Sequence, residues 1–486
     1  MSGGAFAKVY VDRVLNPAFA NWKDLYQEDS LRVHRAHLCM LAETKIIAPE
    51  VAKSLKIGIE KAEAGFVAPD RIPEGVEDLY FLFEKELGDV AGEENAAWLH
   101  TARSRNDMDT TVFRLALKRV MIEFLRTFTA GCERLLRRCR LGEKELTVLY
   151  THGQPANPST TAHYLSALLL DLLADGEDLF MALSDVDRST LGACAITGTG
   201  FPVDRGRVAE LLGTRGFVSN SYQAIATSHW LTKPAQALHA LMLDLGRFAA
   251  DLSHKASCEV GLYDFPDDLV QISSIMPQKR NPVIIEHLRI QAGQTIGLCA
   301  TIEDLYRNVP YQDVNEAADA PVSQLLQAFS YALSAIDLAE AIFAGMKANP
   351  ERARAIALQF GVTTTELADA MVRRFGIGFR AAHGICAAFI RSGQNKEILR
   401  STFYDRIGRV LPWQDAEIDA ILEPWHFVEV RRTEGGPAAD GMSLVYREAE
   451  NSLKTFESRL SDLDARQKSA DQAMIDGWKA IDSMKD

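Results

Sequence analysis

Four short polar segments of the 486-residue chain combine residue types that could carry out chemistry. The segment 273–282 reads Ser-Ser-Ile-Met-Pro-Gln-Lys-Arg-Asn-Pro and brings together two hydroxyls, one lysine and one amide between prolines. Hydroxyl, ammonium and amide groups are donors that can surround a carboxylate. Such a loop is a candidate for chemistry, and the alternative interpretation is a polar surface loop.

The second segment, His-Thr-Ala-Arg-Ser-Arg-Asn-Asp at 100–107, has many donors and few acceptors, which also suits a carboxylate. Its structural alternative is a helix boundary capped by Asn106 or Asp107. The third segment, Thr-His-Gly-Gln-Pro at 151–155, places a histidine where it could act as an acid or base, or as a hydrogen-bonded structural residue. The fourth is Glu286, which taken alone is an exposed helix residue.

Long helices must position these segments. Apolar residues recur at helical spacing in five stretches, and strand-like alternation is almost absent. The five stretches are 110–142, 160–185, 231–257, 282–308 and 321–346. The second is apolar on nearly all sides, which predicts burial inside a bundle or between subunits. The pattern predicts an all-α fold with a central bundle of long helices.

The chain is long enough for three mostly helical domains. We place them at 1–109, with the Ser-Arg-Asn segment, at 110–360, with the bundle and loop 264–282, and at 361–486. Near the start of the last domain, Thr363 and Glu366 have the spacing of a helix cap.

The last helix, from about Ser443 onward, carries apolar residues at spacings of 3, 4 and 3. These residues are Leu453, Phe456, Leu460 and Leu463. Such spacing predicts a coiled-coil-like seam that packs against the body of the chain or against a neighbouring subunit.

The composition excludes several classes of function. The net charge of -13 argues against a nucleic-acid partner, because phosphate contacts need clustered lysine and arginine. The N-terminus lacks the apolar core of a signal peptide, and the apolar runs are too short or too interrupted to span a membrane. The seven cysteines form no CxxC pair, and no metal cluster, P-loop or dinucleotide motif is recognisable. We expect a cytoplasmic protein without a cofactor or bound metal.

The segment 273–282 resembles the signature loop of the fumarase/aspartase superfamily. Segments 100–107 and 151–155 are similar to the argininosuccinate lyase branch in particular, and so are 192–204 and 379–383. The resemblance covers most of the chain, with the motifs in the order of the family.

This resemblance implies a role for each matching residue of the loop. Ser273 would be the base that removes a proton from the carbon beside a substrate carboxylate. Lys279, Asn281 and the backbone amide of Ser274 would stabilise the negative charge that then develops, since preorganised donors of this kind accelerate such steps strongly.

The other segments would complete the site. Ser104, Arg105 and Asn106 match residues that hold the fumarate part of the substrate, and Thr151 matches the opposite wall. Glu286 would pair with His152 and raise its pKa, so that the histidine can protonate the departing amine.

The family also implies a fold of three helical domains, a homotetramer with each site built from three subunits, and small-molecule substrates: fumarate plus an amine or amino acid. The implied reaction is reversible elimination of an amine from an N-substituted aspartate, argininosuccinate or another N-succinyl compound. Alternative functions are a non-catalytic, crystallin-like structural protein on the same scaffold and a fumarase-type carbon–oxygen lyase.

Departures from the family pattern are concentrated on the amine side. Ile272 stands where a glycine is usual, Val283 where an aspartate is usual, and Tyr80 where a histidine is usual. The segments 227–229 and 29–34 also differ, so carboxylates expected to bind a guanidinium are missing or moved. We predict an intact fumarate half and a remodelled amine half. Candidate residues for the remodelled half are Asp29, His34, Tyr80, His229, Tyr311, Gln312 and Asp313.

Overall fold

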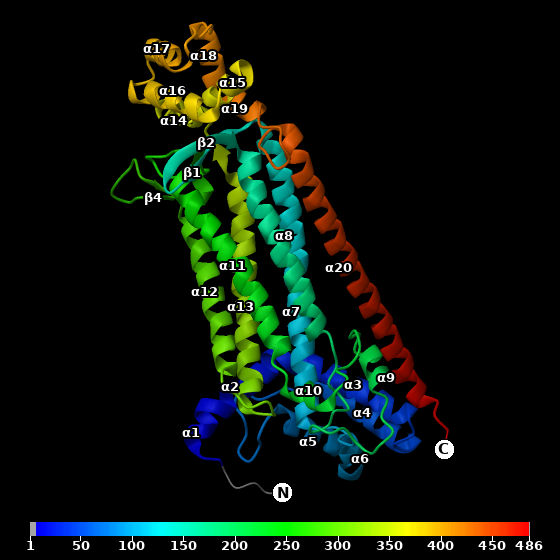
Figure 1. Cartoon of the computed structure of the whole chain (residues 1–486). Helices are drawn as coiled ribbons and strands as arrows, with labels where there is room; N and C mark the ends of the chain where they lie inside the picture. Colours follow the sequence, from blue (N-terminus) through cyan, green and yellow to red (C-terminus); the bar gives the residue numbers. More distant parts are fainter. Residues whose placement is uncertain (1–5, 486) are drawn as a thin grey trace.

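A computed structural model describes residues 6–485, and five long antiparallel helices form its centre (Figure 1). They are α7 (Arg105–Leu141), α8 (Thr161–Val186), α11 (His229–Lys255), α12 (Val283–Tyr306) and α13 (Asp319–Gly345). Each helix lies within a few residues of the stretch predicted from apolar spacing. The all-α fold and its central bundle are confirmed.

Two side-chain caps set where the bundle begins. Ser104 and Asp107 form a capping box at the start of α7, and the Thr160 hydroxyl accepts the backbone N–H of His163 at the start of α8. Such bonds satisfy donors that the first helical turn leaves free. The residue that caps α7 is therefore Ser104 and not Asn106 or Asp107, although Asp107 closes the box.

Helix α8 is mostly buried by elements of its own chain. It packs between α7 and α11, and α20 (Ala439–Asp482) covers a further side. Where α20 crosses, Gly176 leaves room for two aromatic rings, because a Cβ there would lie 2.7 Å from Phe128 and 2.9 Å from Phe456. The apolar character of α8 thus reflects its place inside the bundle.

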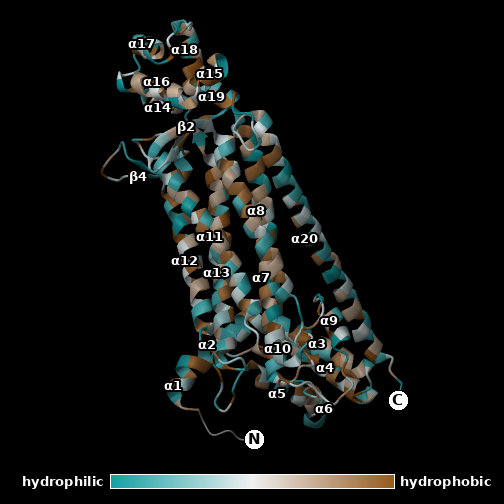
Figure 2. Cartoon of the chain, viewed as in Figure 1, coloured by the Kyte–Doolittle hydropathy of each residue, from teal (hydrophilic) through white to brown (hydrophobic). Residues whose placement is uncertain are grey.

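The predicted seam of the last helix packs against the body of the chain. Leu453, Phe456 and Leu460 are buried, and α20 contacts α8, α7, α3, α4 and α9. Arg459 adds a paired ionic contact, with its two terminal nitrogens 2.8 and 2.9 Å from the Glu177 carboxylate. Figure 2 shows α20 as largely hydrophilic, as a helix with one buried side must be.

The lower end of the bundle in Figure 1 carries the N-terminal helices and the last turns of α20. These elements are α1 (Lys8–Tyr10), η1 (Val11–Leu15), α2 (Asn16–Asn21), η2 (Trp22–Tyr26), α3 (Gln27–Glu43), α4 (Pro49–Gly65), α5 (Leu79–Ala91), α6 (Glu93–Trp98), α9 (Arg205–Leu211) and α10 (Ser221–Ala226). A short turn, η5 (Asn315–Ala317), joins α12 to α13. This is the end at which α7 begins.

The upper end carries three two-stranded sheets. An antiparallel hairpin joins β1 (Leu146–Thr151) to β2 (Gln154–Thr160), after the turn η3 (Gly142–Lys144). The shorter pairs are β3 (Tyr263–Asp264) with β6 (Lys347–Ala348), and β4 (Gln271–Ile272) with β5 (Arg280–Asn281), with the turn η4 (Asp267–Leu269) between β3 and β4. The sequence pattern did not predict the first hairpin, because prolines 155 and 158 interrupt its alternation.

A second hydrophobic core lies above these strands, between residues 367 and 422. The helices of this region are α14 (Pro350–Gln359), α15 (Thr364–Phe375), α16 (Phe379–Arg391), α17 (Lys396–Ile407), α18 (Asp415–Leu422) and α19 (Pro424–Glu429). Helix α15 does begin after Thr363 as predicted, but the Thr363 side chain makes no capping bond. Glu366 is instead buried and binds Arg373 and Arg431, which gives that carboxylate stronger partners than a helix end.

One helix within residues 6–485, α13, has the length and apolar composition of a membrane span, with a mean hydropathy of 1.3. It packs against α12, α7 and α11 in the bundle. The side of α13 that faces these helices belongs to the protein core, and 44% of its apolar stretch is buried.

Candidate active site

Arg105 is held by carboxylates of its own chain. Its Nε and Nη2 lie 3.1 and 3.0 Å from the two oxygens of Asp109, and Nη1 forms an ion pair with Asp78. The guanidinium also lies 4.9 Å from the ring centre of Tyr80 and 5.8 Å from that of Trp22. Burial alone would lower the pKa of Arg105, but Asp109 and Asp78 raise it. The arginine is thus fixed and charged.

The buried carboxylate of Asp107 ties a distant loop to the start of α7. One oxygen accepts the backbone N–H of Ser104 at 2.8 Å, and the other accepts those of Gly192 and Cys194, both at 2.8 Å. Burial raises the pKa of Asp107 to about 6, although these three donors favour the charged form. The loop that resembles the family at 192–204 is therefore anchored beside Ser104.

Asn106 lies at the edge of the lower end, facing the connection between α12 and α13. Its Nδ2 donates to Asp313 Oδ2 at 2.9 Å, and Gln312 is exposed next to this bond. Tyr222 of α10 donates to the carbonyl of Tyr311 in the same connection. Ser104, Asn106 and Gln312 therefore belong to one surface.

Several residues that depart from the family pattern meet behind this surface. Arg103 is 5% exposed and donates to His34 Nδ1 at 2.9 Å and to the Tyr80 hydroxyl at 3.4 Å. The Tyr80 hydroxyl also lies 2.8 Å from His100 Nδ1. Burial and Arg103 hold the pKa of His34 well below its usual value, so the ring is neutral and can accept this bond. His34 and Tyr80 therefore form a connected polar layer beneath Arg105.

The signature loop lies at the upper end and closes as a narrow hairpin. Gln271 pairs with Asn281 and Ile272 with Arg280, and the backbone N–H of Ser273 donates to the Lys279 carbonyl at 3.3 Å. Ile272 occupies extended strand backbone, outside the positive-φ region that would require glycine. The unusual isoleucine is therefore compatible with this form of the loop.

The Ser273 hydroxyl accepts two backbone donors inside the hairpin. The N–H groups of Ile275 and Met276 lie 3.3 and 3.0 Å from its Oγ. Donors that point at an oxygen favour its anionic form. Lys279 and Ser274 are exposed and Asn281 is half-buried, so the carboxylate donors of this loop face outward from the chain.

His152 occupies the tip of the β1–β2 hairpin. It and Gly153 have φ angles of 53° and 73°, which form a tight two-residue turn between Thr151 and Gln154. Thr151 and His152 are both exposed, and Glu286 is exposed in the first turn of α12. Among the bonds of residues 6–485, none joins His152 to Glu286.

The structure places the predicted residues in two groups at opposite ends of the bundle (Figure 1). The lower group is Ser104, Arg105, Asn106 and Gln312, and the upper group is Thr151, His152, Ser273, Ser274, Lys279, Asn281 and Glu286. A 24-residue helix, α12, connects Glu286 at its start to the segment before Gln312 at its end. One chain does not bring the two groups together.

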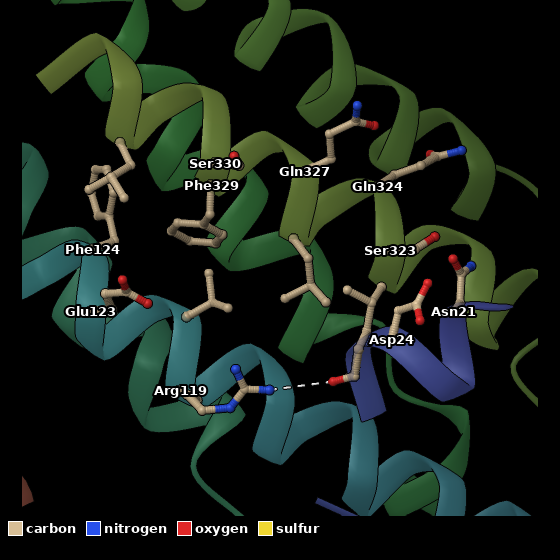
Figure 3. A pocket seen from close by; sticks show the side chains of 14 residues that line it. Asn21, Asp24, Arg119, Glu123, Phe124, Ser323, Gln324, Gln327, Phe329 and Ser330 are labelled. Carbon is tan, nitrogen blue, oxygen red and sulfur yellow. Dashed lines mark hydrogen bonds between the residues drawn. The ribbon is translucent and has the colours of Figure 1, made fainter. Parts of the chain in front are cut away.

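A large hollow in the described chain lies elsewhere, along the side of the bundle (Figure 3). It has a volume of about 670 Å³ between η2, α7 and α13. Polar residues such as Asn21, Arg119 and Gln324 line it, and none of the predicted site residues does. Within residues 6–485, no cluster of His, Cys, Asp or Glu is arranged to hold a metal ion.

Comparison with known proteins identifies the class. A family described as lyase matches residues 47–297. Argininosuccinate lyase 2 of Agrobacterium fabrum is 39% identical over 464 residues, which cover 93% of this chain and 91% of that protein. Argininosuccinate lyase of Methanothermobacter thermautotrophicus is 31% identical over 438 residues, 88% of this chain and 93% of that protein.

Among solved structures, EDDS lyase in complex with formate superposes with a TM-score of 0.84 at 25% identity, covering 99% of this chain and 97% of that one. The fold and both motif groups thus define a fumarase/aspartase-type lyase. The chain belongs to the argininosuccinate lyase branch of that superfamily and is a carbon–nitrogen lyase.

The partners of Arg105 were missed from sequence, although Arg105 and Asp109 have the spacing of a helical ion pair. We expect Arg105→Lys to lower the free energy of unfolding by about 1.5–3 kcal/mol, because an ammonium cannot form the two parallel hydrogen bonds that the planar guanidinium makes with Asp109.

Thermal and denaturant unfolding measure this loss. Arg119→Lys is the matched control, since Arg119 is half exposed and its ion pair with Asp29 has a single contact of 3.2 Å. Equal stability losses in the two variants would contradict the special role of the Arg105 pairings.

Proposed function

We propose that this lyase releases fumarate from an N-substituted aspartate whose amine part is bound differently from that of argininosuccinate. The observation that carries the proposal is the loop 273–281, in which Ser273, Lys279 and Asn281 occupy one closed hairpin. The hairpin supplies a base, a cation and an amide donor together. The proposed site lies where this loop meets the Ser104–Asn106 segment of another subunit.

Ser273 is the base in this proposal. Its deprotonated oxygen, stabilised by the amides of Ile275 and Met276, takes the proton from the carbon beside the substrate carboxylate. The C–H electron pair moves into that carboxylate, and Lys279 and Asn281 stabilise the resulting dianion. The pair then forms the carbon–carbon double bond of fumarate while the C–N bond breaks and its electrons leave on nitrogen.

The departing nitrogen must gain a proton, and we assign its donation to His152 with Glu286. The exposed position of both groups leaves them free to meet substrate or another subunit. Ser104, Asn106 and Thr151 hold the second carboxylate in this proposal. Arg105 contributes its positive charge to the site and does not bind substrate through its guanidinium, because that group already donates to Asp109.

Assembly of the site requires more than one chain in this proposal. The two groups of residues lie at opposite ends of α12. The exposed face of that helix carries Ile290, Gly293 and Gly297, and a Cβ added at either glycine would meet no other part of the chain within 4 Å. A smooth face of this kind suits close packing of a helix from another copy. We propose a homotetramer in the cytoplasm, with three helical domains at 1–109, 110–360 and 361–486.

We propose that the part of the site that binds the amine differs from that of argininosuccinate lyases because of the polar layer around His34 and Tyr80. His34, Tyr80 and His100 are neutral groups joined to Arg103. A guanidinium prefers planar carboxylate acceptors, but Asp78 and Asp109 already bind Arg105, and Glu84 accepts the Tyr80 hydroxyl at 3.1 Å. An amine or amino acid without a guanidinium fits this surface better.

Ultraviolet absorbance of fumarate tests the function directly. Incubation of the enzyme with fumarate and a panel of amines and amino acids should consume the signal, and argininosuccinate should release it more slowly than the best adduct. Turnover of argininosuccinate equal to that of the best adduct would contradict the remodelled amine half. Failure with every compound would contradict the proposed activity.

Two substitutions test the assignment of the loop. We expect Ser273→Ala to lose nearly all turnover, and Lys279→Met to weaken both succinate binding and turnover by roughly 10²–10³, since each removes a group that acts on the developing charge. Circular dichroism and thermal unfolding should stay unchanged, because both side chains lie in a solvent-exposed hairpin. Full activity of Ser273→Ala would move the base to another residue.

A further inference from the structure

A second charged group lies directly behind the hairpin that carries His152. Lys255 is the last residue of α11 and is 1% exposed, which is unusual for an ammonium. Its Nζ lies 4.6 Å from the ring centre of Tyr150 and 5.1 Å from that of Tyr164. Two aromatic faces on one buried cation form a cage in which cation–π attraction replaces part of the lost hydration.

Lys255 has few polar partners inside this cage. Its Nζ donates to the carbonyl of Val148 at 3.4 Å and lies 3.7 Å from Asp251 Oδ2, an oxygen that also accepts the Tyr164 hydroxyl at 2.7 Å. Burial lowers the pKa of Lys255, and Asp251 opposes this shift. An ammonium has three N–H donors, and these long contacts satisfy them only in part. Burial of Lys255 therefore lowers the stability of the fold, which suggests that the residue has a role other than stability.

The contacts of Lys255 fall on the part of β1 that determines the direction of the hairpin tip. Val148 lies opposite Pro158, which has no N–H to donate, and the pairing register shifts between Leu149 and Tyr150. A shift of this kind bends a strand and redirects the side chains that follow. Thr151 and His152 are the next residues along the chain.

We infer that Lys255 is a positioning residue for His152, holding β1 through the Val148 carbonyl and the Tyr150 ring so that the histidine points into the assembled site. The inference rests on the proposed role of His152 as proton donor. Other charged or titratable groups that face Tyr150 are His254, whose ring centre lies 5.5 Å away, and Arg352. Burial raises the pKa of Tyr150, and the charge of Arg352 partly opposes this rise.

Lys255→Met tests the inference, because methionine fills the cage without the charge or the donor. We expect kcat for amine addition to fumarate to fall at least about tenfold, because in this direction a correctly placed His152 must take up the proton that it donates during elimination. The KM for fumarate should stay within about twofold, since the carboxylate donors lie on other elements. The melting temperature should hold or rise, because a buried charge is removed.

Lys118→Met is the matched control. Lys118 is also a buried lysine, but its Nζ binds Asp187 at 2.8 Å and the Gly213 carbonyl at 2.6 Å, far along the chain from the hairpin. This variant should lose stability and keep its kcat. Wild-type kcat and KM in Lys255→Met, or a kcat loss that Lys118→Met shares, would overturn the inference.

Tyr150→Leu keeps the charge of Lys255 and removes the ring above it. We expect the same selective loss of kcat, and an unchanged kcat would overturn the inference even if Lys255→Met failed to fold. An inactive wild-type enzyme would instead contradict the proposed function, so the two failures are distinguishable.

Discussion

The stiffness of the long helices is the constraint on which the rest of this structure depends. Helix α7 has 37 residues, and an α-helix rises about 1.5 Å per residue, so its ends lie roughly 55 Å apart. Ser104 sits at one end of this bundle, and the hairpin of His152 and the loop of Ser273 sit at the other. No loop movement within one chain can close such a distance.

The two ends differ in how firmly they hold their polar groups. At the lower end, the charged groups have several partners within the chain: Asp107 accepts three backbone N–H groups, and Arg105 binds Asp78 and Asp109. At the upper end, Lys279 is exposed on a hairpin held by a few backbone bonds. A fixed lower surface and an adaptable upper loop suit a site that must exclude water after substrate binds.

Much of this fold could be predicted from the sequence, because long helices with apolar stripes leave a strong periodic signal. All five bundle helices and the seam from Leu453 to Leu460 were found in this way. The β1–β2 hairpin was missed, since its prolines hide the alternation of strands. The motifs located the candidate residues, but the pairing of Arg105 with Asp78 joins residues 27 positions apart, and no local pattern reveals such a contact.

Tyr80 and His34, which depart from the family pattern, both contact the buried Arg103. Tyr80 provides both a ring face for Arg105 and a hydroxyl for Arg103, and His34 accepts a bond that only a neutral ring can accept. These residues form one hydrogen-bonded layer. At the other end, the buried charge of Lys255 contacts β1 just before the exposed His152, for which we propose a catalytic role.

Mixing of two inactive variants tests most directly the claim that each site is built from the lower end of one chain and the upper end of another. Asn106→Ala and Ser273→Ala should each be inactive alone. After dissociation and reassembly together, some sites would combine an intact Asn106 from one chain with an intact Ser273 from another, and activity should return. Absence of any recovered activity in well-folded mixed oligomers would contradict the account.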